Sequence, residues 1–123
     1  MYPSKEFLEA RLHEGKKLKM YFGIDPTGPT LHIGHMIGIR KLAQFQKLGH
    51  TAILLIGDFT AMIGDPTDKT ATRKQLTRKE ILNNMKLYKK QAGDILSFFG
   101  KNKAEVMYNS KWLAKMKFEE VLS

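Results

Sequence analysis

The stretch YFGIDPTGPTLHIGH, from Tyr21 to His35, decides the predicted fold of this chain. Its first residues form an apolar strand, a turn rich in Pro and Gly follows, and a helix is predicted to begin near His32. Because His32 and His35 lie three residues apart, they are expected on one face of the first helical turn. The free N–H groups of a helix N-terminus attract anions, so the stretch predicts a phosphate site.

The helix after this turn is predicted to run from Ile33 to Leu48 and to end at Gly49. Apolar residues cover most of its circumference, which predicts a helix that is buried on most sides. Gly34 and Gly38 lie in its opening turns, although a glycine inside a helix costs about 1 kcal/mol relative to alanine. The two glycines therefore indicate a flat groove in which something must come close to the backbone.

Further helices and strands are predicted on both sides of this unit. The run TAILLI is apolar throughout, as in a parallel strand that is covered on both faces. The region after it is rich in Gly, Asp, Thr and Pro and is predicted to be a long functional loop. In chain order, the other predicted elements are a helix capped by Ser4 and ended by Gly15, a strand Leu18–Ile24, a strand Thr51–Ile56, the loop Gly57–Leu76, a long helix that starts with the capping box Thr77–Glu80 and runs to Phe99, a strand Glu105–Asn109 and a last helix capped by Ser110.

The predicted order is a helix, then β-α-β-α-β, then a helix. Strands that alternate with helices indicate an α/β fold with a parallel sheet and right-handed crossovers, which is one half of a Rossmann-like nucleotide-binding domain. Ligands bind at the carboxyl ends of such strands, where the loops 23–31 and 57–76 both lie. The fingerprint G-x-G-x-x-G is absent after the first strand and a P-loop is absent from the chain, which argues against a dehydrogenase and a P-loop enzyme.

The composition is that of one small domain with a basic surface. The 123 residues suffice for a single core, and the lack of cysteine excludes disulfides, thiolate zinc sites and thiol nucleophiles. No apolar run long enough to span a membrane and no signal peptide is found, so a cytoplasmic location without membrane contact is expected. Twenty-one Lys and Arg against twelve Asp and Glu give a net charge of +9. This charge favours a polyanionic partner such as a nucleotide or RNA, although many basic proteins have only a solvated cationic surface.

The histidine pair has three interpretations. As hydrogen-bond donors, His32 and His35 would bind the oxygens of a polyphosphate while its charge redistributes. They could instead be surface histidines near a helix start, but the preceding turn and the intervening Gly34 favour a functional pair. The metalloprotease pattern needs His at i and i+4 with a Glu, whereas the spacing here is three with no Glu, so no metal site is expected.

Polar residues after the first strand and in the long loop have structural and functional interpretations. Asp25 and Thr27 fit an ordinary β-turn, but they also lie where a carboxylate binds an ammonium or hydroxyl group and a threonine donates to phosphate. Tyr21 is either a core aromatic or part of a pocket floor. The loop is either a solvated basic segment or a cationic lid over a leaving polyphosphate, with a carboxylate at the mouth of the crevice. These loop residues are Asp65, Lys69 and Arg73.

The same residues resemble the signature of the class I aminoacyl-tRNA synthetases, whose His-Ile-Gly-His element stands intact at residues 32–35. In detail the chain is similar to bacterial tyrosyl-tRNA synthetases, since the tryptophanyl relatives lack the Tyr-x-Gly-x-Asp-Pro-Thr run. The resemblance covers nearly the whole chain. The matching runs are YxGxDPT at 21–27, FQxLGH at 45–50, GDFTAMIGDP at 57–66 and NSxWL at 109–113.

This resemblance implies that tyrosine is activated with ATP to tyrosyl-adenylate and pyrophosphate, and that the tyrosyl group then passes to tRNA(Tyr). It implies ATP with Mg²⁺ as the substrate complex, no tightly bound cofactor, and catalysis by positioning and charge stabilisation. It also implies roles by position: tyrosine binding at Tyr21 and Asp65, phosphate binding at Thr27 and His32, the ribose at His35, the nucleotide or adenylate at Gly23, Asp25 and Gly34, and mobile catalytic cations at Lys69 and Arg73.

The sequence departs from the family pattern at two places. Thr67-Asp68 stands where a Ser-Gly pair is common, so the Asp68 carboxylate is expected to weaken the cationic pull of Lys69 beside it. Phe22 stands where some members have a small polar residue. Neither change alters the assignment.

Residues 1–123 match the N-terminal half of the catalytic domain in the resemblance. The C-terminal half and the anticodon-binding domain are therefore expected to be absent, and little or no activity is expected from this chain alone. For a full-length protein, a homodimer is a possible oligomeric state. Two other functions remain as alternatives, a nucleotide- or RNA-binding module without chemistry and another nucleotidyltransferase with the same histidine motif.

Overall fold

A parallel sheet forms the centre of the computed structural model, which describes residues 4–63, 76–117 and 119–120. The strands are β1 (Lys19–Ile24), β2 (Thr51–Ile56) and β3 (Glu105–Tyr108), and they lie in the order β1-β2-β3. In the register, Lys19 pairs with Thr51 and Ile53 pairs with Glu105. The parallel α/β sheet predicted from the sequence is confirmed.

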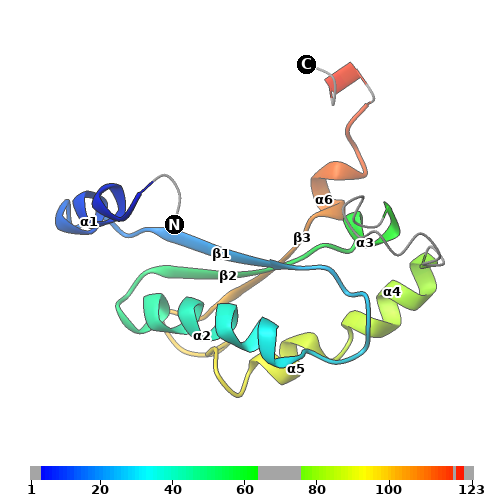
Figure 1. The fold of residues 1–123 in the computed structure, drawn as a ribbon, viewed down its shortest axis with the longest axis horizontal. Coiled ribbons are helices and arrows are strands. Elements are labelled where there is room, and N and C mark those ends of the chain that lie inside the picture. Colours follow the sequence, from blue (N-terminus) through cyan, green and yellow to red (C-terminus); the bar gives the residue numbers. More distant parts are fainter. Residues whose placement is uncertain (1–3, 64–75, 118, 121–123) are drawn as a thin grey trace.

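The helices fall into two groups around this sheet (Figure 1). One face is covered by α2 and α5, whereas α3, α4 and α6 gather near the carboxyl ends of the strands and α1 lies beside the opposite end. No helix in the described part of the chain is both long and apolar enough to cross a membrane. The helices are α1 (Lys5–His13), α2 (Ile33–Lys47), α3 (Thr60–Ile63), α4 (Arg78–Met85), α5 (Tyr88–Ala92) and α6 (Ser110–Leu113).

The core lies between the sheet and α2. Burial alternates along β2, and its fully buried positions are Ala52, Leu54 and Ile56. Their partners on α2 include Ile39 and Leu42 in the same apolar cluster. The expectation that β2 is covered on both faces is wrong for the described residues, because both covering helices lie on one side of the sheet (Figure 1). A continuous apolar run shows that a strand tolerates burial, but it does not show which neighbours are present.

The expectation that α2 is buried on most sides is also wrong within the described residues. Ile33 and Ile37 are 84% and 71% exposed, and they lie one turn apart. Only the side of α2 that faces the sheet is buried, and it carries Ile39, Leu42, Ala43 and Gln46. Apolar periodicity predicts which sides of a helix could be covered, and the sheet covers only one of them.

Several helix ends follow the sequence rules. Ser4 caps α1 by accepting a hydrogen bond from the Phe7 backbone N–H at 3.1 Å. Thr77 and Glu80 form the predicted capping box, in which the Thr77 N–H donates to Glu80 Oε2 at 2.7 Å. Gly49 ends α2 with a φ of 89°, a left-handed conformation that glycine adopts without strain.

Three predicted element boundaries need correction. The expected long helix from residue 77 to Phe99 is two helices, α4 and α5, separated at residues 86–87 and ended by the cap Gly93. Residues 86–87 contain no Gly or Pro, so no local signal marks this break. Ser110 is the first residue of α6 rather than its cap, which is Asn109. The expected loop 57–76 contains the short helix α3, while residues 64–75 lie outside the described residues.

Candidate functional site

His32 and His35 are brought together at the start of α2, as predicted. His32 is the N-cap, and its Nδ1 accepts a hydrogen bond from the Gly34 N–H at 3.1 Å. His35 Nδ1 accepts from the His32 backbone N–H at 3.2 Å, which closes a capping box made of two histidines. The rings stack with centroids 3.6 Å apart at an interplanar angle of 21°. Because both Nδ1 atoms accept, the proton of each neutral ring lies on Nε2, where it can be donated to a ligand.

The half-buried His35 is held in its neutral form. Desolvation is the larger cause, and the neighbouring His32 adds to it, so the pKa of His35 lies below its ordinary value of 6.5. A neutral His35 keeps Nδ1 free of a proton, and that atom must stay free to cap the His32 N–H. The capping box therefore depends on pH.

Acidification is expected to destabilise the chain through His35. A histidine whose pKa is lower in the folded state than in the unfolded state binds more protons when unfolded. Its stabilising contribution is complete above about pH 6.5 and is lost as the pH falls through the folded-state pKa. Urea unfolding between about pH 5 and pH 7 should therefore show a steeper loss of stability for the wild type than for His35→Asn.

The matched control for this experiment is His13→Asn, because His13 lies exposed in the last turn of α1. This control should keep the pH profile of the wild type. An identical profile for His35→Asn and the wild type would show that His35 is not the titrating group.

The two glycines of α2 do not share one role. At Gly34 an added Cβ would lie 3.0 Å from His32 Cε1, so this glycine leaves room for the stacked pair. At Gly38 the space is filled by the ring of Phe22, which an added Cβ would meet in a clash. The close approach to the backbone that was predicted at Gly38 is therefore made by a side chain of the same chain.

Polar side chains from all three strand ends are linked at the carboxyl edge of the sheet. Thr60 Oγ1 donates to Asp25 Oδ1 at 2.8 Å. Asn109 Nδ2 donates in turn to Thr60 Oγ1 at 3.0 Å, and Asn109 Oδ1 accepts from the Phe59 N–H at 2.9 Å. Gly57 makes the approach possible, because an added Cβ there would collide with the Asp25 carboxylate. The network fixes the orientation of Asp25, one of the predicted site residues.

A second carboxylate at this edge has a structural role. Asp58 is only 2% exposed, and its Oδ1 accepts from the Ser110 N–H at 3.0 Å. Its Oδ2 accepts from Arg78 Nη2 at 3.4 Å, so the charge of the buried carboxylate is paired. Asp58 thereby ties α4 and α6 to the end of β2.

The other predicted site residues are placed as follows. Tyr21 is 72% exposed on the face of the sheet that α2 does not cover, so of its two interpretations the core aromatic is wrong. Gly23 lies two residues on and shares this face. Thr27 is exposed in the turn, where its N–H donates to the Asp25 carbonyl at 2.8 Å. The predicted loop residues Asp65, Lys69 and Arg73, with Asp68, lie outside the described residues.

Sequence reasoning assigned no site role to Thr60, Asn109 and Asp58. A local signal for two of these site residues was available, because Asp58 follows the end of β2 and Asn109 follows the end of β3 within two residues. For metal binding, the described ranges contain no group of three or more His, Cys, Asp or Glu that could hold an ion.

Comparison with known proteins identifies a family that matches this chain. A family model described as tRNA synthetases class I (W and Y) matches residues 13–123. The chain belongs to this family. Membership in the class I tRNA synthetases agrees with the parallel sheet and confirms the resemblance carried by residues 32–35.

Curated relatives align with most of this chain. The "Tyrosine--tRNA ligase" of Carboxydothermus hydrogenoformans is 50% identical over 117 residues, which are 95% of this chain and 28% of that protein. The "Tyrosine--tRNA ligase" of Moorella thermoacetica is 48% identical over 122 residues, with 96% and 29% covered. The chain thus spans less than a third of the length of these curated relatives.

Solved structures of synthetases show the same fold. A C-terminally truncated mitochondrial tyrosyl-tRNA synthetase of Coccidioides posadasii superposes with a TM-score of 0.75 at 30% identity, covering 98% of this chain and 34% of that one. The corresponding Aspergillus nidulans protein gives a TM-score of 0.74 at 28% identity, with 97% and 36% covered.

Proposed function

We propose that this chain provides the ATP-binding part of a tyrosine–tRNA ligase and corresponds to the N-terminal half of its catalytic domain. In the proposed reaction, the carboxylate of tyrosine attacks the α-phosphorus of ATP, which gives tyrosyl-adenylate and releases pyrophosphate. The tyrosyl group then passes to the terminal ribose of tRNA(Tyr) and AMP leaves. The names of the relatives support the choice of tyrosine.

One observation carries the proposal. Two stacked histidines at the N-terminus of a fifteen-residue helix both hold Nδ1 as an acceptor, so both Nε2–H groups are available to oxygen atoms of a nucleotide. Donors that are fixed before the reaction stabilise the charge that develops on a polyphosphate without reorganisation. The helix N-terminus adds a favourable field for the same anion.

The remaining roles follow the family pattern and stay proposals. Tyr21 would contact the phenol of tyrosine from the open sheet face, and Thr27 would bind phosphate beside His32. Gly23, Asp25 and Gly34 would pack against the nucleotide, and His35 would lie at its ribose. Among the residues outside the described ranges, Asp65 would bind the ammonium group and Lys69 and Arg73 would act on pyrophosphate.

Mg²⁺ would accompany ATP as part of the substrate. A homodimer and a cytoplasmic location also stay predictions.

Tyrosine-dependent ATP–pyrophosphate exchange tests the function. The chain is assayed with the segment of the Carboxydothermus hydrogenoformans ligase that it does not cover, supplied in trans. Exchange that requires tyrosine supports the proposal. RNA binding without any exchange would favour the nucleotide- or RNA-binding module, which the net charge of +9 makes the second candidate. Exchange driven by another acceptor would favour a different nucleotidyltransferase.

Loss of either histidine is expected to affect the reaction more than tyrosine binding. His32→Ala or His35→Ala should slow adenylate formation by roughly 10²-fold, because His32 is proposed to act on the reacting polyphosphate and His35 to hold the ribose of the same nucleotide. The tyrosine affinity should change much less. Single-turnover kinetics in the same complemented assay measure both quantities, with His13→Ala as the control that should change neither. Equal losses of rate and tyrosine affinity would contradict a role in the transition state.

A further inference from the structure

The turn that leads from β1 to His32 is fastened by side chains from two distant helices. This turn covers residues 25–31 and contains Pro26 and Pro29, which have no backbone N–H to donate. Within this described stretch the backbone supplies one hydrogen bond of its own, from the Thr27 N–H to the Asp25 carbonyl. A turn with so few internal bonds needs partners from elsewhere to keep one conformation.

Asn84, Tyr88 and Gln91 supply these partners. Asn84 Nδ2 donates to the Pro26 carbonyl at 3.0 Å, and the Tyr88 hydroxyl donates to the Gly28 carbonyl at 2.6 Å. Gln91 bonds the turn twice, since its Nε2 donates to the Pro29 carbonyl at 3.2 Å and its Oε1 accepts from the Leu31 N–H at 2.7 Å. We call these three side chains the turn clamp.

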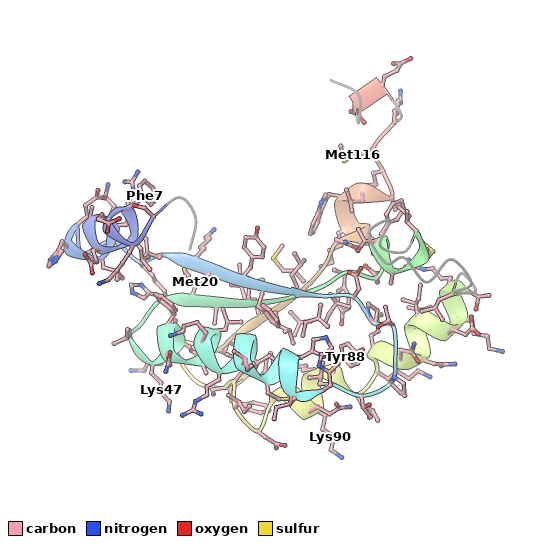
Figure 2. All side chains as sticks on the ribbon, in the orientation of Figure 1. Phe7, Met20, Lys47, Tyr88, Lys90 and Met116 are labelled. Carbon is pink, nitrogen blue, oxygen red and sulfur yellow. The ribbon has the colours of Figure 1, made fainter. Side chains whose placement is uncertain are left out.

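One residue of the clamp, Tyr88, lies in the core of the domain. Tyr88 is 1% exposed and belongs to the apolar cluster under the sheet. Figure 2 shows it near the N-terminal end of α2. Burial raises the pKa of Tyr88, so its hydroxyl remains a donor at neutral pH. The break between α4 and α5 separates Asn84 from the other two, yet all three side chains reach the same turn.

We propose that the turn clamp positions the phosphate-binding residues, so that Asn84, Tyr88 and Gln91 are positioning residues for the reaction proposed above. Two of the residues proposed to bind phosphate depend on this turn, Thr27 within it and His32 directly after Leu31. A displacement of about 1 Å at a reacting group can cost roughly 10²-fold in rate. The clamp residues themselves need not touch the ligand. The inference rests on the proposed function.

The sharpest variant is Tyr88→Phe, which removes one hydroxyl and keeps the buried ring. Gln91→Glu is the second variant, because its carboxylate still accepts from the Leu31 N–H but no longer donates to Pro29. The matched controls are Tyr108→Phe on β3 and Asn83→Ala, an exposed neighbour of Asn84 on α4.

The first readout is the affinity of the 123-residue chain for ATP and for inorganic pyrophosphate, measured by calorimetry. Tyr88→Phe and Gln91→Glu are expected to weaken both by roughly tenfold, while the two controls stay within about twofold of the wild type. In the complemented exchange assay, the KM for ATP should rise and the KM for tyrosine should stay unchanged. Equal effects of Tyr88→Phe and Tyr108→Phe would overturn the proposal.

The second readout separates the clamp from the proposed function. If the wild type binds neither ATP nor pyrophosphate, the proposed function fails, and the clamp is judged by NMR in the absence of ligand. Gln91→Ala should then speed amide hydrogen exchange at Leu31 by roughly tenfold and shift the ring resonances of His32, whereas Asn83→Ala should do neither. Unchanged exchange at Leu31 and unchanged His32 resonances would refute the clamp.

Discussion

Replacing Gly57 with alanine is expected to destabilise the chain by up to about 3 kcal/mol, near the upper end for overpacking a filled site. The backbone of Gly57 is not in the left-handed region, so the cost comes from contact rather than from conformation. An added Cβ would collide with the Asp25 carboxylate and come within 2.6 Å of Thr60 Oγ1. Asp25 would have to move, and it would lose the hydrogen bond from Thr60.

Urea unfolding of the two proteins measures this effect, and Gly28→Ala is the matched control because no atom lies within 4 Å of its added Cβ. The control should change the free energy of unfolding by less than about 0.5 kcal/mol. Asp25→Ala in the Gly57→Ala background should recover part of the loss, because it removes the atom that collides. Equal unfolding midpoints for Gly57→Ala and Gly28→Ala would show that the Asp25 carboxylate does not lie over Gly57.

Gly57→Ala should also weaken ATP binding, and by more than its loss of folding stability alone would cause. Asp25 is proposed to pack against the nucleotide, and its present orientation depends on Thr60 and Asn109. A side chain that is displaced by a methyl group cannot keep a geometry set by two hydrogen bonds. Calorimetric titration with ATP, at a temperature where both proteins are folded, measures the affinity directly.

Local signals in the sequence predicted the parts of the fold that local physics determines. The Ser4 cap, the Thr77–Glu80 capping box and the end of α2 at Gly49 each depend on residues within about four positions of one another. The histidine pair belongs to the same class, since the spacing of three is enough to place His32 beside His35. Strand and helix alternation was likewise sufficient for the parallel sheet.

Long-range contacts explain what the sequence could not predict. Thr60 and Asp25 are 35 residues apart, and Asn109 and Thr60 are 49 apart, so their network exists only once the strands are paired. The bonds of the turn clamp join residues 58 to 62 positions apart. The open face of the sheet escaped prediction for a related reason, because an apolar pattern cannot report which covering elements are present.

The second large effect is expected at Gly38, where alanine should destabilise the chain although alanine is the better helix former. Propensity alone would favour alanine by about 1 kcal/mol. The added Cβ, however, would meet three atoms of the half-buried Phe22 ring, which packs against the core cluster. Overpacking of this kind costs about 1–3 kcal/mol, so a net loss of stability of up to about 2 kcal/mol is expected.

A double-mutant cycle with Phe22→Ala isolates this contact. Phe22→Ala alone should destabilise the chain, because it removes a ring that packs on the core. In that background Gly38→Ala should become neutral or stabilising, since the space is now empty and only the helix propensity remains. The coupling free energy between the two positions should therefore be at least about 1 kcal/mol.

The cycle also tests how the Phe22 ring fits beside the helix that carries this family's histidine motif. Gly38 lies one turn after His35, so a ring that rests on Gly38 supports the same face of α2 that presents the histidines. If Gly38→Ala costs the same in the wild type and in the Phe22→Ala background, the ring does not occupy that space. If the coupling is large, the aromatic residue at position 22 and the glycine at position 38 form one packing unit. Such a unit explains how a bulky side chain fits at position 22, where some family members have a small polar residue.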